Sequence, residues 1–248
     1  MSCFFYKISV LLSNFLKTSM QKIIARHKYY LAQKRYRNSS LVGFILFIVS
    51  LTVNRYASFY ATAQASNSVT DLLLDNIPVM RVEWIVNDVA ALFGFSMIFF
   101  ILWQPRRIPF LLKAVALFIF IRSGFIVLTH LAPFPERVIL DPTDIFRTLT
   151  YGGDYFFSGH TGMSFLTALI YWKEKAIRYF CLVISILLSV GVIIGHLHYS
   201  IDVLAAFFIT YSIFVLAQRL FPYAYSVFSE GRELPHADKL SDIEKAVN

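Results

Sequence analysis

The sequence predicts an all-α membrane protein: a bundle of six transmembrane helices preceded by an N-terminal amphipathic helix that lies in the membrane interface. Hydrophobic residues make up 57% of the 248 residues and charged residues only 15%, against roughly 25% charged in an average soluble domain. The apolar residues also gather in blocks of about 20, the length that a helix needs to cross roughly 30 Å of hydrocarbon.

The first 40 residues form a basic segment with helical periodicity. Apolar side chains recur on one helix face and polar ones on the other, which favours an interfacial helix over a cleaved signal peptide. The segment has no Asp or Glu, so it carries much of the net charge of +8. Anionic lipid headgroups, rather than nucleic acid, are its expected partners. The apolar positions are Phe4, Ile8, Leu11, Leu12, Phe15, Ile23 and Ile24, and the basic ones are Lys7, Lys17, Lys22, Arg26, Lys28, Lys34, Arg35 and Arg37.

Six apolar blocks follow this segment, and each predicts one membrane span. Three regions are therefore expected: the basic cytoplasmic segment 1–40, a six-span domain 41–221 and a polar cytoplasmic tail 222–248. The expected spans are about 41–60, 84–103, 111–131, 152–172, 177–196 and 198–219.

Basic residues in the short connections set the orientation of the bundle. Arg106 and Arg107 precede the third span, and Lys173, Lys175 and Arg178 lie between the fourth and fifth. Since short basic connections stay on the cytoplasmic side, both termini are expected there. The connections after the first and third spans lean acidic and are expected on the outer face. Short loops and compact length favour a bacterial inner membrane, with the periplasm as the outer compartment.

The first of two unusual clusters on the outer face is the segment GGDYFFSGHTG at residues 152–162. A glycine-rich entry into a helix presents free backbone N–H groups and the positive end of the helix dipole, which suits an anion such as phosphate. Glycine-rich turns are common, however, so this cluster alone is weak evidence for a binding site.

The second cluster is HYSID at residues 198–202, in which His198 and Asp202 are four residues apart and would share one helix face. A carboxylate that accepts a hydrogen bond from one imidazole nitrogen leaves the other free as a nucleophile. The alternative is a structural hydrogen bond between neighbouring turns. Ionisable residues inside an apolar bundle are costly, which favours a functional interpretation.

The segments GDYFFSGHT (153–161) and HYSIDV (198–203) resemble the two catalytic motifs of the sphingomyelin synthase family, a branch of the type 2 phosphatidic acid phosphatase superfamily. The resemblance extends to a segment from Arg122 to Pro135 and, loosely, to Asp75–Pro78. It implies a catalytic domain at residues 41–221. The proline spacing after Leu131 differs by one residue from the family pattern, which leaves the substrate more open than the reaction type.

The resemblance implies a phosphotransfer reaction through a phosphohistidine. His198 would attack the phosphorus of a phospholipid donor, Asp202 would hold its tautomer, and His160 would serve as acid and then as base. The expected acceptor is ceramide or a diacylglycerol-type lipid.

Arg122 is expected to clamp the phosphate because its planar guanidinium can neutralise two oxygens; the alternative is a pair with another intramembrane group. The remaining expected substrate-binding residues are Ser158 and Gly159, as donors to the phosphate, and Asp154 and Tyr155, facing a cationic headgroup, with a helix cap as the alternative role of Asp154.

Two other functions stay open. A hydrolase of the same fold would use water as acceptor and act as a lipid phosphatase or a phospholipase C, and a proton-coupled transporter could use intramembrane His and Asp residues. No metal and no cofactor is expected, because Cys3, Cys181 and His196 lack partners at ligand spacing. His196 and His130 are expected to be interfacial polar residues.

Overall fold

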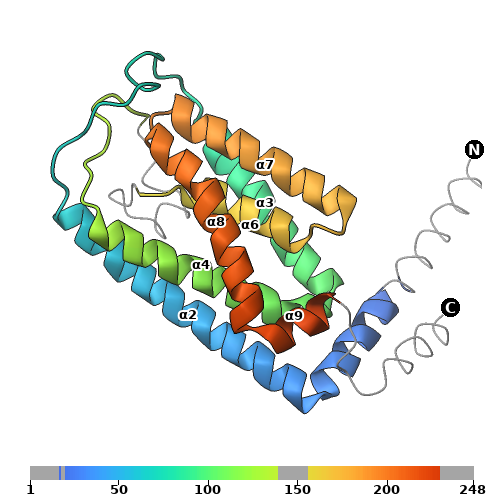
Figure 1. Cartoon of the computed structure of the whole chain (residues 1–248). Coiled ribbons are helices and arrows are strands. Elements are labelled where there is room, and N and C mark those ends of the chain that lie inside the picture. The colour runs from blue at the N-terminus through green and yellow to red at the C-terminus, as the bar shows by residue number, and fades with distance from the viewer. Residues whose placement is uncertain (1–16, 18–19, 139–155, 230–248) are drawn as a thin grey trace, which may run out of the picture.

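The computed structural model describes residues 17, 20–138 and 156–229, and these residues contain helices and no strand. A helix at residues 20–32 comes first. The helices labelled in Figure 1 follow: α2 (Lys34–Ala63), α3 (Glu83–Trp103), α4 (Ile108–Leu128), α6 (Gly159–Ile170), α7 (Lys175–Ile194), α8 (Ser200–Leu220) and α9 (Pro222–Ser229). A 3-10 turn, η1 (Pro105–Arg107), lies between α3 and α4.

Five of the described helices are long and apolar enough to cross a membrane: α2, α3, α4 extended by η1, α7 and α8. Their number and composition indicate a multi-pass membrane protein. The predicted count of six is not confirmed, because α6 has only 12 residues and would span roughly 18 Å of the roughly 30 Å hydrocarbon core. Residues 156–158, inside the predicted span 152–172, are not helical.

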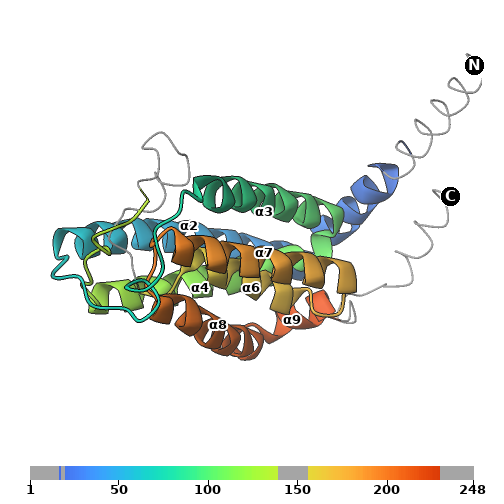
Figure 2. The same cartoon turned by 90° about the horizontal axis from the view of Figure 1, so that it is seen from above.

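The short helix α6 lies inside the bundle, and the longer helices surround it in both views (Figures 1 and 2). It contacts α4, α7 and α8, while α2 runs along α4 and α3 along α7. Gly162 permits the close approach of α6, because a Cβ there would lie 2.7 Å from the Phe118 ring and 2.9 Å from Thr210 Oγ1. A residue with any side chain at 162 would therefore push α6 away from α4 and α8.

Large apolar side chains on the outside of the long helices are exposed, including Phe44 on α2, Phe95 on α3, Ile186 on α7 and Phe208 on α8. A soluble protein would bury such a continuous apolar surface. On a membrane protein the same surface faces lipid tails, so the exposure is consistent with spans at these helices.

At the α9 end of the bundle, the fold differs from two predicted boundaries. Helix α2 starts at Lys34, inside the predicted segment 1–40, and the prediction of a solvated tail from residue 222 is wrong for α9, which buries Ala224, Val227 and Phe228. Arg35 lies 4.0 Å from the centre of the Tyr223 ring, which joins the start of α2 to α9. The interfacial position of the N-terminal helix stays a prediction, and its first 16 residues lie outside the described part of the chain.

Candidate active site at the start of α6 and α8

The turn between α7 and α8 places His198. After Ile194 the chain forms a Schellman motif: the Leu197 N–H donates to Val192 O at 2.8 Å and the His196 N–H to Ile193 O at 2.9 Å. His196 takes the left-handed position of this motif, with φ at 53°, which glycine usually occupies. The motif reverses the chain within three residues, so α8 can start at Ser200 and run back along the bundle.

His198 lies two residues before α8, so the prediction that it shares a helix face with Asp202 is wrong. Tyr199 is the N-cap residue of α8 and Asp202 belongs to its first turn. The pair still meets: His198 Nδ1 lies 3.6 Å from Asp202 Oδ2, with the two side chains 8% and 0% exposed. The distance is within ion-pair range and longer than a hydrogen bond, so the carboxylate faces the imidazole without a closed hydrogen bond.

The Asp202 carboxylate is anchored by the start of its own helix. Its Oδ2 accepts a 3.0 Å hydrogen bond from the Tyr199 N–H, and the positive end of the α8 dipole favours a negative charge there. Its Oδ1 is buried and has no hydrogen-bond partner among the described residues. Asp202 is therefore both a helix cap and a carboxylate with remaining acceptor capacity beside His198.

A backbone hydrogen bond joins the start of α6 to the start of α8. The Ser158 N–H donates to the Asp202 carbonyl oxygen at 3.2 Å, and the Ser158 hydroxyl caps α6 by accepting from the Thr161 N–H at 3.4 Å. His160 is the second residue of α6. The two predicted histidine motifs, whose histidines are 38 positions apart in the sequence, thus meet at one end of the bundle.

Arg122 reaches this junction from α4 and is 6% exposed. Its Nε donates to Phe157 O at 3.1 Å, and its Nη1 to Asn54 Oδ1 on α2 at 3.4 Å. A Cβ at Gly159 would lie 3.2 Å from Arg122 Nε, so glycine lets the guanidinium lie against the N-terminus of α6. The structure brings Arg122 close to Ser158 and Gly159. The bond to Asn54 also gives Arg122 an intramembrane partner, and its role as a phosphate clamp stays a prediction.

The sequence interpretation gave Asp71 no role, yet this residue caps α8 from a distant loop. Its Oδ2 accepts from the Ser200 N–H at 2.7 Å and from the Ser200 hydroxyl at 2.9 Å, and its Oδ1 accepts from the Leu73 and Leu74 N–H groups. Burial raises the pKa of the Asp71 carboxyl, but these hydrogen bonds outweigh it and lower that pKa below its usual range. No local sequence signal joins Asp71 to Ser200, 129 positions away.

Two loops are tied to the start of α8 through Tyr199. Its hydroxyl donates to Ala132 O at 2.9 Å and accepts from the Val69 N–H at 3.3 Å. His196 Nδ1 lies 2.9 Å from Glu136 O. The loops after α2 and α4 are thus held beside the histidine motifs, and His196 has a role in holding one of them.

The remaining predicted residues are distributed as follows. Asp154 and Tyr155 lie outside the described residues. His130 lies just beyond α4, where its ring packs on Tyr60 and its carbonyl accepts from Ser66. Cys181 is buried on α7.

One known family matches the part of the chain that contains this site. The family model described as PAP2 superfamily C-terminal matches residues 152–219, while comparison with curated proteins and with solved structures gives no match. The matched family suggests a lipid phosphatase or phosphotransferase type of function. A PAP2 superfamily C-terminal domain is thus found at residues 152–219, the part of the chain that contains α6, α7, α8 and both histidine motifs.

Proposed function

We propose that the protein is a phospholipid headgroup phosphotransferase of the sphingomyelin synthase type, which makes sphingomyelin or ceramide phosphoethanolamine through a phosphohistidine. The observation that carries the proposal is the hydrogen bond from the Ser158 N–H to Asp202 O. It joins the helix that begins with His160 to the helix that follows His198. The proposed nucleophile, its carboxylate and the proposed acid-base histidine thus belong to neighbouring segments at one end of the bundle.

In the first half-reaction, His198 Nε2 attacks the phosphorus of the donor phospholipid. Nε2 is the nucleophilic nitrogen because Nδ1 faces Asp202 at 3.6 Å, and the carboxylate stabilises the positive charge that develops on the ring. A phosphorus–nitrogen bond forms, and the bond from phosphorus to the glycerol oxygen breaks. His160 donates a proton to that oxygen, and diacylglycerol leaves.

In the second half-reaction, the primary hydroxyl of ceramide attacks the phosphohistidine. His160, now neutral, takes the hydroxyl proton, so the same group acts as acid and then as base. The new phosphorus–oxygen bond forms as the phosphorus–nitrogen bond to His198 breaks. The phospho-headgroup is thereby transferred, and both histidines return to their starting protonation states.

Arg122 and the start of α6 stabilise the phosphoryl oxygens in this proposal. Arg122 lies against Gly159, where the backbone N–H groups and the dipole of α6 also favour an anion. A guanidinium and a helix N-terminus on the same oxygens stabilise the extra negative charge of the transition state more than that of the ground state. Asp154 and Tyr155 stay proposed contacts of a cationic choline or ethanolamine headgroup.

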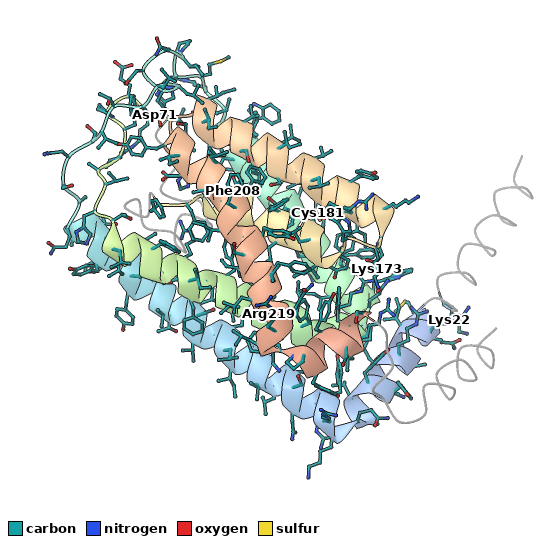
Figure 3. The ribbon with its side chains drawn as sticks, in the orientation of Figure 1. Lys22, Asp71, Lys173, Cys181, Phe208 and Arg219 are labelled. Carbon is teal, nitrogen blue, oxygen red and sulfur yellow. The ribbon has the colours of Figure 1, made fainter. Side chains whose placement is uncertain are left out.

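The proposed location is a bacterial inner membrane, with both termini in the cytoplasm and the site on the periplasmic face. Figure 3 shows Asp71 at one end of the bundle and Lys22, Lys173 and Arg219 toward the other. A basic end supports a cytoplasmic position by the positive-inside rule.

The second candidate function is a hydrolase of the same fold, a lipid phosphatase or phospholipase C in which water replaces the acceptor. The match to a PAP2 superfamily model favours it, because this match suggests phosphatase as well as phosphotransferase function. The two functions share the first half-reaction and differ only in what attacks the phosphohistidine.

The test is an assay of the purified protein in detergent with fluorescent ceramide and either phosphatidylcholine or phosphatidylethanolamine. We expect a labelled phosphosphingolipid, reduced by about a thousandfold or more in His198→Ala because the nucleophile is lost. His130→Ala, a histidine outside the motifs, is the matched control and should keep its activity. Headgroup or phosphate release without labelled product, lost in His198→Ala, would support the hydrolase; full activity in His198→Ala would contradict both functions.

A further inference from the structure

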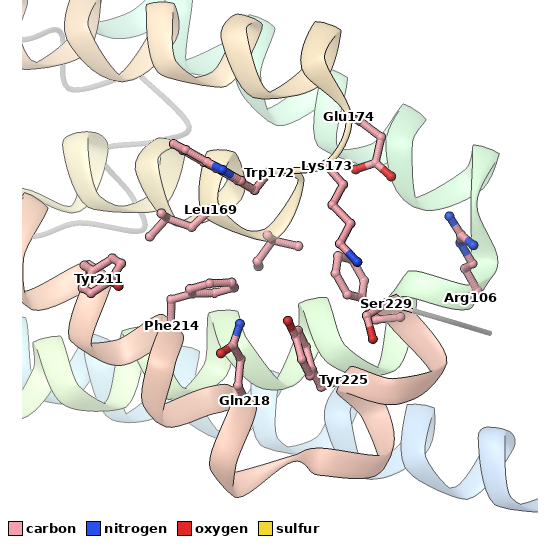
Figure 4. Close-up of a pocket in the computed structure, with 12 residues that line it drawn as sticks. Arg106, Leu169, Trp172, Lys173, Glu174, Tyr211, Phe214, Gln218, Tyr225 and Ser229 are labelled. Atoms are coloured by element: carbon pink, nitrogen blue, oxygen red, sulfur yellow. The ribbon is translucent and has the colours of Figure 1, made fainter. Parts of the chain in front are cut away.

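A cavity of about 450 Å³ lies at the end of the bundle opposite the histidine motifs. Figure 4 shows it between the α6–α7 turn, the last turns of α8 and α9. Gln218, which lines it, follows Asp202 by 16 residues of α8, a rise of roughly 24 Å. The cavity is therefore separate from the proposed active site and has the volume of a typical small-molecule pocket.

One part of the cavity wall is polar and basic. Lys173 extends from the α6–α7 turn toward Ser229 and Tyr225, and the Gln218 amide and the Tyr225 hydroxyl point into the same space (Figure 4). Arg106 lines the cavity from the α3–α4 connection. Donors from four separate segments thus line one cavity.

The charge of this wall is positive. Neither Arg106 nor Lys173 forms an ion pair within the described part of the chain. Glu174, the acidic residue of the wall, bonds through both carboxylate oxygens to the buried Arg107, which neutralises it. Among the described residues, the cavity therefore presents two cations that have no paired carboxylate, and it favours an anion.

The other part of the wall is apolar, and two of its side chains are exposed on the outside of the bundle. Leu169 and Phe214 line the cavity, and Trp172 and Tyr211 border it with side chains 50% and 56% exposed. A free phosphate ion would leave this apolar wall unused. A membrane lipid would use both parts, with its phosphate at the cations and an acyl chain along α8.

We propose that this cavity binds an anionic glycerophospholipid of the adjacent membrane leaflet, with Arg106 and Lys173 on the phosphate and Phe214 and Tyr211 beside an acyl chain. The proposal does not depend on the reaction at His198. Basic pockets between membrane helices commonly take anionic headgroups on the cytoplasmic side, the side on which the basic connections place this end.

Trp172 provides a direct measurement of occupancy. In a Trp84→Phe/Trp103→Phe background, Trp172 is the remaining tryptophan of the chain. The full-length protein in mixed micelles is titrated with phosphatidylglycerol brominated near the top of its acyl chains, or with equally brominated phosphatidylcholine, and fluorescence quenching is followed. We expect half-maximal quenching at an about tenfold lower mole fraction of phosphatidylglycerol, because two cations contribute to its binding.

The matched pair of variants distinguishes a site from general charge. Arg106→Gln/Lys173→Gln should remove the preference for phosphatidylglycerol, while Lys175→Gln/Arg219→Gln, which removes the same charge at the same end outside the cavity wall, should keep it. Equal loss in both double variants, or no preference in the starting protein, would overturn the proposal. Competition by millimolar inorganic phosphate at constant ionic strength would overturn the lipid assignment in favour of a soluble phosphate.

Discussion

The two ends of the bundle hold their acidic groups in different ways. Near the histidine motifs, Asp202 and Asp71 accept hydrogen bonds from backbone N–H groups at the start of α8. At the opposite end, Glu174 bonds through both oxygens to the guanidinium of Arg107, which also lies 4.3 Å from the centre of the Tyr171 ring. A backbone anchor leaves Asp202 Oδ1 available and the negative charge uncompensated, whereas an arginine anchor uses the whole carboxylate for structure.

The comparison teaches that the binding partner distinguishes the carboxylate of the proposed reaction, Asp202, from the structural carboxylate of Glu174. The partner determines whether the carboxylate keeps an effective negative charge. A helix N-terminus stabilises an anion without cancelling its charge toward a neighbouring imidazole, while a bidentate arginine cancels that charge. Substitutions at the two ends should therefore affect activity and stability separately.

The largest expected effect is on activity, in Asp202→Asn. Asparagine can still accept from the Tyr199 N–H, so the cap of α8 is retained, but a neutral amide cannot stabilise the imidazolium of His198. We expect kcat to fall by about 10³ to 10⁴ with Tm nearly unchanged. Asp88→Asn, at an exposed position on α3, is the control. Unchanged activity in Asp202→Asn would contradict the proposed role of the Asp202 charge beside His198.

For Glu174→Gln we expect a loss of stability with little change in activity. This change leaves the guanidinium of Arg107, 1% exposed, without its carboxylate, so stability should fall by about 3 kcal/mol. Thermal unfolding of the detergent-solubilised protein measures this, and the turnover of the folded fraction should be unchanged. The double variant Arg107→Met/Glu174→Gln should recover much of the loss; if it does not, the ion pair is not the cause.

An intermediate effect on stability is expected for Asp71→Asn, because the new amide nitrogen cannot accept from the Ser200 N–H. Leaving that group unpaired costs about 1–3 kcal/mol. The lowered pKa of Asp71 means that its contribution is present above the ordinary aspartate pKa of about 3.9 and is lost as the pH falls through the lower folded value.

The measurement for Asp71 is Tm as a function of pH. The starting protein should lose stability as the pH falls below about 4, and Asp71→Asn should show a smaller loss over the same range. Parallel curves for the two proteins would mean that Asp71 stays protonated or unbonded in the folded state.

The smallest effect is expected for Gly159→Ala, which adds a methyl group 3.2 Å from Arg122 Nε. The guanidinium must shift by a few tenths of an ångström, and we expect kcat/KM to fall about tenfold through loss of alignment. Gly94→Ala is the matched control, because a Cβ there meets nothing within 4 Å. Equal activity of the two variants would remove Arg122 from the proposed phosphate site.

Much of the architecture follows from the sequence. Apolar blocks predict the five long helices because the hydrocarbon core demands that length and internal backbone hydrogen bonding. The apolar blocks do not predict the boundaries of α6 and α9. An apolar block is equally compatible with a span and with a short helix enclosed by others. The charged residues from Glu230 onward made the whole segment from 222 resemble a solvated tail, although residues 222–229 are largely apolar.

The sequence by itself determined which residues are chemically unusual: His160, His198, Asp202 and Arg122 are polar groups in apolar surroundings, and their types suggest phosphate chemistry. Only the tertiary structure decided how they meet. His198 approaches Asp202 through a Schellman turn and a helix cap, Arg122 reaches α6 because residue 159 has no side chain, and Asp71 caps α8 from 129 positions away. Local patterns encode helices because backbone hydrogen bonds are local, whereas these contacts depend on how whole helices pack against one another.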